Sequence, residues 1–136
     1  MIKALSHVTL FVNNQDDAKA FYVDKLGFKL HTDVVMENGF RWLTVTPPEQ
    51  PDLEIVLMEP KTGPMFDEES AAALRALMKK GLLGAGALRV DDCRKTYEEL
   101  KKKGVPFKGE PREQFYGIEA ILSDGLGNWF SMTEPK

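Results

Sequence analysis

A histidine and a glutamate lie in two segments that have the composition of β-strands. His7 begins a run of β-branched and aromatic residues, and Glu54 lies in a second, aliphatic run. Because successive side chains of a strand point to opposite faces, His7 shares a face with Thr9 and Phe11, and Glu54 shares one with Val56. A carboxylate among aliphatic neighbours needs a polar partner if it is buried. One interpretation is therefore a hydrogen-bonded pair of His7 and Glu54.

An arginine in a later strand has the chemistry to bind an anion. Arg89 lies four residues after Ala85 and shares a strand face with Ala85 and Ala87. A guanidinium above small residues forms a positively charged wall that suits a carboxylate or phosphate of a ligand. The alternative is an ion pair with an acidic neighbour such as Glu119, and both interpretations remain open.

Aromatic side chains also lie where they can line a pocket. Arg41 and Trp42 begin a strand, and alternation places one of them on the binding face without telling which. Trp42 can stack on a planar ligand or pack in the core. Tyr116, between Phe115 and Gly117, can border a pocket or pack within a turn.

Two further residues have reactive side chains. Cys93 lies near an expected helix N-terminus, which lowers the pKa of a thiol, but no histidine is near it in the sequence, so we interpret it as structural. His31 is a strand residue without an identifiable partner and is expected to be exposed. The chain has no phosphate-binding loop and no Ser-His-Asp order, which argues against those chemistries.

The elements that carry these residues follow one pattern twice, a strand, a helix and three strands. The pair Asn13-Asn14 and Asp92 offer helix N-caps, and Gly27 and Gly104 are typical of helix ends. The expected strands span residues 7–12, 28–36, 40–46, 53–59, 85–90, 105–107, 117–123 and 129–133, and the expected helices span residues 15–26, 67–80 and 93–103.

The two halves of the pattern align as an internal repeat. Residues 10–13 align with residues 88–91 at an offset of 78, and Gly27 aligns with Gly104 at an offset of 77. Landmarks in the later strands agree with these offsets within one residue. The sequence therefore predicts two copies of one β-α-β-β-β unit.

These motifs resemble the vicinal oxygen chelate superfamily, the glyoxalase/bleomycin resistance/dioxygenase group. The resemblance spans nearly the whole chain and is carried by Phe21-Tyr22 followed by Leu26-Gly27-Phe28, and by Asp124 followed by Gly127-Asn128. It implies an α+β fold in which two βαβββ modules form a cup-shaped mixed sheet, and it implies a homodimer. The expected organisation is a single domain, 1–136, with module one at 1–60, a linker helix at 61–83 and module two at 84–136.

The resemblance also implies where a metal would bind. Family members take metal ligands from the first and last strands of each module, which here gives His7 and Glu54 in module one. The repeat offsets give Ala85 and Ser131 in module two, and neither side chain is a good ligand. A catalytic zinc normally has three protein ligands. The predicted metal set is therefore His7 and Glu54 alone, an incomplete site, and the expected cofactor is none or a weakly bound divalent metal.

Composition and charge exclude several classes of protein. The chain has 136 residues, is 43% hydrophobic and 29% charged, and carries a formal net charge of −3. These values exclude a disordered chain, a fibre and a coiled coil. The chain lacks the basic composition of a nucleic-acid-binding protein and an apolar run long enough to span a membrane. The single cysteine excludes an internal disulfide and favours a cytoplasmic location.

The sequence thus predicts a cytoplasmic, homodimeric protein that holds a small organic molecule in the cup. It resembles the bleomycin-resistance branch, which binds a ligand without chemistry, and is expected to be metal-free or weakly metal-binding. The alternative is a divalent-metal-dependent lyase, isomerase or dioxygenase that acts on a substrate with vicinal oxygens. Neither nucleic acid nor a membrane is an expected partner. The expected pocket residues are His7, Thr9, Phe11, Arg41, Trp42, Glu54, Val56, Arg89, Tyr116 and Ser131.

Overall fold

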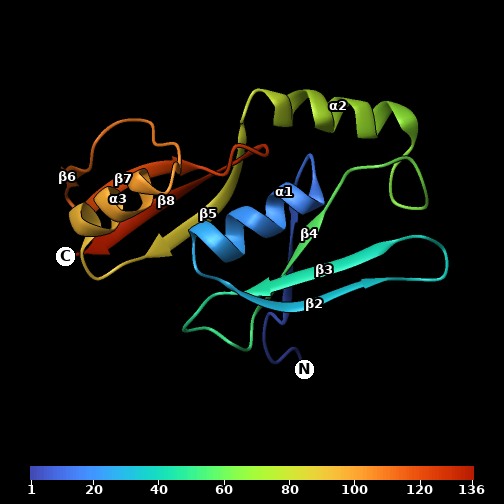
Figure 1. Ribbon diagram of the computed structural model, residues 1–136, viewed down its shortest axis with the longest axis horizontal. Coiled ribbons are helices and arrows are strands. Elements are labelled where there is room, and N and C mark those ends of the chain that lie inside the picture. Colours follow the sequence, from blue (N-terminus) through green and yellow to red (C-terminus); the bar gives the residue numbers. More distant parts are fainter. The chain divides into compact units, whose positions relative to one another are not determined.

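The computed structural model describes all 136 residues and contains two four-stranded mixed sheets (Figure 1). The chain divides into two compact units, Met1–Ala72 and Ala73–Lys136, with the boundary inside helix α2 (Glu68–Lys79). Each unit contains one of the sheets. The α+β class predicted from the sequence is confirmed. None of the helices combines the length and the apolar character that crossing a membrane requires.

The first unit has the predicted order of a strand, a helix and three strands. Its elements are β1 (His7–Phe11), α1 (Gln15–Lys19), the π-helical segment η1 (Ala20–Lys25), β2 (Lys29–Val35), β3 (Arg41–Thr46) and β4 (Glu54–Met58). The strand order is β1-β4-β3-β2, with β1 parallel to β4 and the other pairs antiparallel. Asn14 caps the helix by accepting a hydrogen bond from the backbone N–H of Asp17. Gly27, at a φ of +77°, follows the helical segment as predicted.

The second unit repeats this topology. Its elements are β5 (Leu83–Arg89), α3 (Cys93–Lys102), β6 (Arg112–Gln114), β7 (Gly117–Ser123) and β8 (Asn128–Pro135). The strand order β5-β8-β7-β6 matches that of the first sheet, again with a parallel pair, β5 with β8, at one edge. Asp92 caps α3 by accepting a hydrogen bond from the backbone N–H of Lys95. The predicted internal repeat therefore corresponds to two βαβββ modules.

The prediction for the second strand of module two was wrong. Residues 105–107 form no strand, and only an isolated bridge joins Phe107 to Leu122. Pro106 has no N–H to donate to a ladder, which prevents regular pairing at this point. The strand next to β7 is instead β6, five residues further along the chain.

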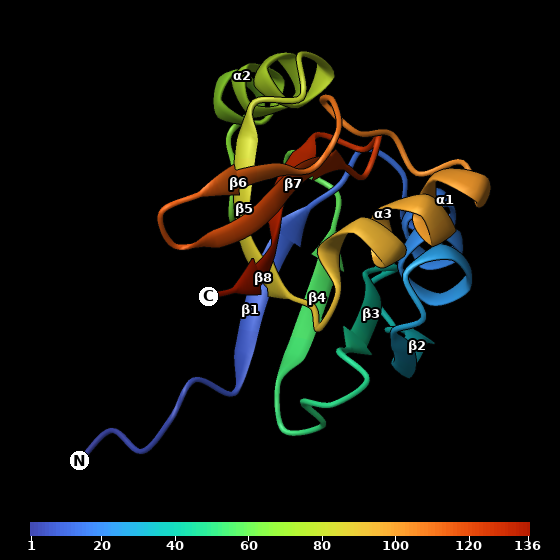
Figure 2. The same cartoon turned by 90° about the vertical axis from the view of Figure 1, so that its left-hand side faces the viewer.

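In each module the helix packs against one face of the sheet (Figures 1 and 2). In module one, Leu10, Leu43 and Leu57 of the sheet are buried together with Phe21 and Tyr22 of η1. Alternate side chains of a strand point to opposite faces of the sheet. The residues directly before and after each of these leucines therefore lie on the face that no helix of this module covers. That opposite face is the one that carries most of the predicted site.

Module two is built in the same way. Leu122, Phe130 and Met132 of its sheet are buried with Cys93 and Tyr97 of α3. Burial raises the pKa of the Cys93 thiol, so the expected lowering by the helix N-terminus does not prevail. The thiol donates a hydrogen bond to the backbone carbonyl of Met132, which agrees with the structural role expected for it.

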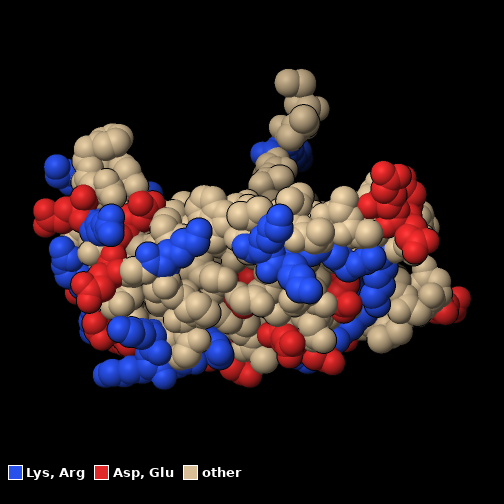
Figure 3. Space-filling view, turned by 90° about the horizontal axis from the view of Figure 1, so that it is seen from above, with Lys and Arg blue, Asp and Glu red and all other residues tan.

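Charged side chains of both signs are interspersed on the face drawn in Figure 3. Such a surface differs from the single-sign basic stripe that proteins use to follow a nucleic acid backbone.

Candidate functional site

Six of the predicted site residues share one face of the first sheet. The register pairs His7 with Glu54 and Thr9 with Val56, and it pairs Val56 with Thr44 on the next strand. Directly paired residues lie on the same side of a sheet, so these side chains point away from α1. We call this side the module-one face, and it comprises His7, Thr9, Phe11, Trp42, Thr44, Glu54, Val56 and Met58.

Glu54 is the centre of a polar cluster on the module-one face. One carboxylate oxygen lies 2.8 Å from Nε2 of His7, and the other lies 3.0 Å from Nδ1 of His31. The Thr44 hydroxyl donates a hydrogen bond of 3.0 Å to the second oxygen. The pair of His7 and Glu54 is thus present, as one interpretation of the sequence proposed. The expectation that His31 has no partner was wrong, because a register shift between Leu30 and Thr32 brings it into the cluster.

The donor set of this cluster does not fit a metal centre. No group of three or more His, Cys, Asp or Glu side chains in the chain has an arrangement that could hold a metal ion. Both oxygens of Glu54 already contact imidazole nitrogens, and neither His7 nor His31 has a second carboxylate near it. Glu54 is therefore held by His7, His31 and Thr44.

The pairing register also corrects the position that corresponds to Glu54 in module two. The Val12 N–H donates to the Met58 carbonyl, and in module two the Val90 N–H donates to the Thr133 carbonyl. Met58 and Thr133 are therefore equivalent positions. Glu54 lies four residues before Met58, so its counterpart is Trp129, four residues before Thr133, and not Ser131. The repeat offset is 78 in the first strands of the modules but 75 in the last strands. The predicted alignment of residues 53–55 with residues 130–132, at an offset of 77, was therefore wrong.

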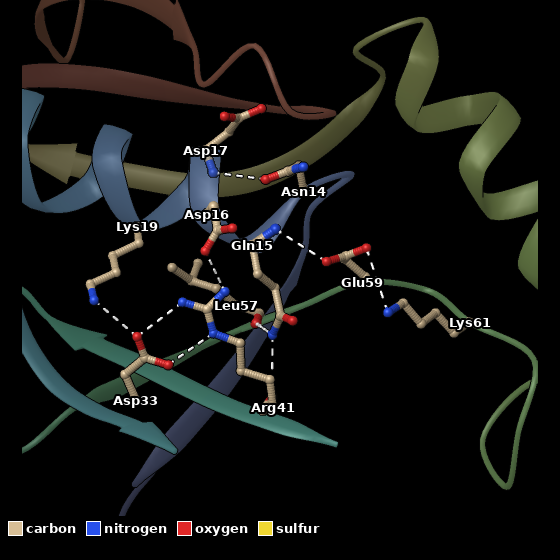
Figure 4. Close-up of polar contacts among 10 residues, drawn as sticks. All are labelled: Asn14, Gln15, Asp16, Asp17, Lys19, Asp33, Arg41, Leu57, Glu59 and Lys61. Carbon is tan, nitrogen blue, oxygen red and sulfur yellow. Dashed lines mark hydrogen bonds and ion pairs between the residues drawn. The ribbon is translucent and has the colours of Figure 1, made fainter. Parts of the chain in front are cut away.

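The structure shows which of Arg41 and Trp42 lies on the module-one face. The ring of Trp42 lies 6.2 Å from that of His7, centroid to centroid. Arg41 points to the helix side, where it donates two hydrogen bonds to Asp33 and one to Asp16 (Figure 4). The guanidinium is thereby committed to two carboxylates and is not available to a ligand.

Asp33 is the acceptor that joins β2, β3 and α1. Arg41 donates to its two oxygens at 2.8 and 2.9 Å, and Lys19 donates at 2.9 Å. These charged hydrogen bonds hold the pKa of the Asp33 carboxyl well below its usual range. The same contacts raise the pKa of the Arg41 guanidinium. The network fixes the helix against the hairpin whose other side carries Trp42.

A pocket of about 400 Å³ lies at the end of β4, between the β2–β3 turn and residues 61–66. Its wall is predominantly apolar and includes Phe40, Met58 and Phe66. Ring contacts connect it to the module-one face, because Phe40 lies 6.4 Å from Trp42 and Phe66 lies 5.5 Å from Phe11. Among the predicted site residues, only Arg41 borders this pocket directly.

Polar residues at one side of the pocket are held in fixed positions. The side-chain amide of Gln15 donates to the backbone carbonyls of Leu57 and Arg41 at 2.9 and 3.2 Å (Figure 4). The backbone N–H of Gln15 donates to Glu59, and Lys61 lies 3.9 Å from that carboxylate. No sequence pattern indicated this pocket, because residues 61–66 lie outside regular elements and have no hydrophobic periodicity.

The remaining predicted residues lie in module two. Ser131 and Tyr116 both donate hydrogen bonds to Glu119, the latter at 2.5 Å, and the Ser131 hydroxyl lies 2.8 Å from that of Thr133. The bond to Glu119 raises the pKa of the Tyr116 phenol. Arg89 is exposed, and the ion pair with Glu119 that was one interpretation of the sequence is not formed. The face of the second sheet opposite α3 carries Ala87, Arg89, Glu119, Ile121, Trp129, Ser131 and Thr133, and we call it the module-two face.

Comparisons with known proteins agree with this architecture. Residues 4–132 match the family model of the Glyoxalase/Bleomycin resistance protein/Dioxygenase superfamily. Protein YurT of Bacillus subtilis (strain 168) is 35% identical over 126 residues, which cover 93% of this chain and 94% of YurT. The crystal structure of UcmS2 has 45% identity and a TM-score of 0.89, covering 98% of this chain and 99% of that one. The crystal structure of TnmS3, an antibiotic binding protein from Streptomyces sp. CB03234, has 30% identity and a TM-score of 0.76. The match covers 99% of this chain and 98% of that one.

Substitution of Asp33 tests the network behind Trp42. A carboxyl whose pKa is lowered in the folded state stabilises that state above its unfolded pKa of about 3.9, and this contribution is lost as the pH falls further. Asp33→Asn should therefore lower the free energy of unfolding at pH 7 by roughly 1–2 kcal/mol, as expected for charged hydrogen bonds at a partly exposed site. The difference from the wild type should shrink below pH 4 in urea unfolding experiments. Asp52→Asn, at an exposed carboxylate without an ion pair, is the matched control. A difference that is the same at pH 7 and pH 3 would contradict the assignment.

Proposed function

Since the chain belongs to the glyoxalase/bleomycin resistance protein/dioxygenase superfamily, we propose that it is a cytoplasmic binding protein for a small aromatic molecule. The ligand occupies the pocket beside β4 and stacks on the aromatic residues of the module-one face. Binding requires no divalent metal and leaves the ligand chemically unchanged.

The observation that supports this proposal is a pair of ring contacts that join the pocket wall to the module-one face. Phe40 and Phe66 belong to the pocket wall, and they contact Trp42 and Phe11 on the module-one face. A volume of about 400 Å³ lies within the range of small-molecule sites, which are mostly apolar with a few fixed polar groups. Gln15 and Glu59 supply such groups at the side of the pocket.

The class of ligand is supported by a relative. TnmS3, with which this chain shares 30% identity over nearly its full length, is described as an antibiotic binding protein. Aromatic antibiotics present flat, conjugated surface, and offset stacking on Trp42 suits such a surface. We therefore propose an antibiotic-like aromatic compound.

Binding of aromatic antibiotics tests the proposal. In calorimetric titrations with a panel that includes bleomycin, at least one compound should bind the wild type with a micromolar dissociation constant. Trp42→Ala should weaken that binding about tenfold, because loss of a stacked aromatic side chain costs more than 1 kcal/mol. Phe115→Ala, at a residue that is 88% exposed on the other unit, is the control and should bind as the wild type does. No binding by any aromatic compound, or equal binding by Trp42→Ala, would contradict the proposal.

The same titrations separate this function from metal-dependent catalysis. Treatment with EDTA should change the dissociation constant less than twofold, because Glu54 is held by His7 and His31 rather than left for a metal. Added zinc or nickel should not restore or increase binding. A tenfold loss on EDTA treatment that either metal reverses would favour a divalent-metal-dependent lyase, isomerase or dioxygenase instead.

We further propose that the chain forms a homodimer through the β2 edge of the first sheet. An unpaired edge strand with apolar side chains favours association. β2 is the last strand of its sheet, and the exposed apolar residues on and beside it are Leu30, Val34, Val35, Met36 and Phe40.

Light scattering at micromolar concentration should give twice the 15.3 kDa mass of the chain. Val35→Glu should shift the protein toward the monomer, because it adds a charge to an apolar contact. Leu82→Glu, at an exposed leucine of the other unit, should not have this effect. A wild-type mass of 15.3 kDa would exclude the dimer.

A further inference from the structure

The Glu119 carboxylate on the module-two face is partly buried and has only neutral partners. Tyr116 donates to one of its oxygens and Ser131 donates to the other. Arg112 is the cross-strand neighbour of Glu119, and Arg89 lies in the same cross-strand row, yet neither forms an ion pair with it. No basic side chain of the chain therefore forms a direct ion pair with the Glu119 carboxylate.

A partly buried carboxylate of module one has a different environment. Asp33 forms ion pairs with Arg41 and Lys19. A basic partner of this kind offsets the unfavourable desolvation of a partly buried charge. Glu119 has no such partner.

The hydrogen-bond network around Glu119 has acceptors to spare and no free hydroxyl proton. The hydroxyl protons of Tyr116 and Ser131 both go to Glu119. Since the Ser131 proton is used in this way, the bond between Ser131 and Thr133 must be donated by Thr133. All three hydroxyl protons are thus donated in the direction of the carboxylate. The unused acceptors are the second lone pairs of the Glu119 oxygens and the lone pairs of the Tyr116 and Thr133 hydroxyl oxygens. The network therefore suits a group that only donates.

An aromatic side chain beside the carboxylate suits the same kind of group. Tyr116, which donates its hydroxyl proton to Glu119, presents its phenol ring there. A cation close to such a ring is attracted by the π-system.

We propose that Glu119, with Tyr116, Ser131 and Thr133, forms a binding subsite for the protonated amine of a small molecule. An ammonium group carries three donors, no acceptor and a positive charge that can pair with the carboxylate. The subsite consists of residues of the second unit only, and it does not depend on the function proposed above. Arg89 and Arg112 oppose the binding of a cation, and both are exposed, so their charges are screened by solvent.

A series of three probes of similar size tests this inference. The wild type is titrated with phenethylamine, 2-phenylethanol and 3-phenylpropionate, and the backbone amide signals of Glu119, Ser131 and Thr133 are followed by NMR. The amine should bind at least fivefold more tightly than the alcohol, and the carboxylate should bind most weakly. Arg89→Ala should increase amine affinity about twofold, since it removes a like charge.

Glu119→Gln keeps the size of the side chain and should reduce amine affinity at least fivefold while changing alcohol affinity less than twofold. The control is Glu113→Gln, which removes the same charge from an exposed residue of the neighbouring strand and should leave amine binding unchanged. Ser131→Ala keeps the carboxylate and should keep the preference for the amine, which provides a second test if Glu119→Gln is poorly folded. Equal binding of amine and alcohol to the wild type, or equal losses in the two glutamine variants, would overturn the inference.

Discussion

The parallel pairing of the first strand of each module with its last strand is the constraint on which the rest of the structure depends. A parallel pair needs a long crossover, and the chain places a helix and a hairpin between β1 and β4. The helix covers one face of the sheet and buries its aliphatic side chains. The other face is left for polar and aromatic residues, and it receives the side chains of both candidate sites. The pocket and the Glu54 cluster follow from this division.

The two modules use the same frame for different chemistry. Phe11 and Met58 pair at one end of the module-one face, and their counterparts in module two are Arg89 and Thr133. Trp42 corresponds in the same way to Glu119, and Glu54 to Trp129. At Phe11 and Trp42, module one therefore has aromatic residues where module two has charged ones, and at Glu54 the arrangement is reversed. A duplicated unit can diverge in this way because substitutions on the open face leave the helix-covered core intact.

Strand alternation correctly predicted which residues of the site share a face, but it could not predict which of the two faces points away from the helix. His7, Thr9 and Phe11 share a face as expected, and so do Glu54 and Val56. Alternation could not choose between Arg41 and Trp42, because that choice depends on the pairing with β4. The same limit explains why Ser131 was wrongly aligned with Glu54. A register shift between Gly84 and Gly86 and a shorter repeat offset change which residue of β8 is equivalent to Glu54. His31 gained its partner through another register shift, which leaves no mark in the sequence pattern.

Chemical-shift mapping can locate the bound ligand on the protein. The wild type, labelled with ¹⁵N, is titrated with the aromatic antibiotic that binds it best, and the backbone and indole N–H signals are followed. Our account predicts saturable shifts at the Trp42 indole and at the backbone amides of Phe11, Phe40 and Phe66, with little change at Leu122 or Tyr97 in the core of module two. Shifts that are absent from Trp42 and Phe66, or that are confined to the second unit, would contradict the claim that the module-one face and its pocket hold the ligand.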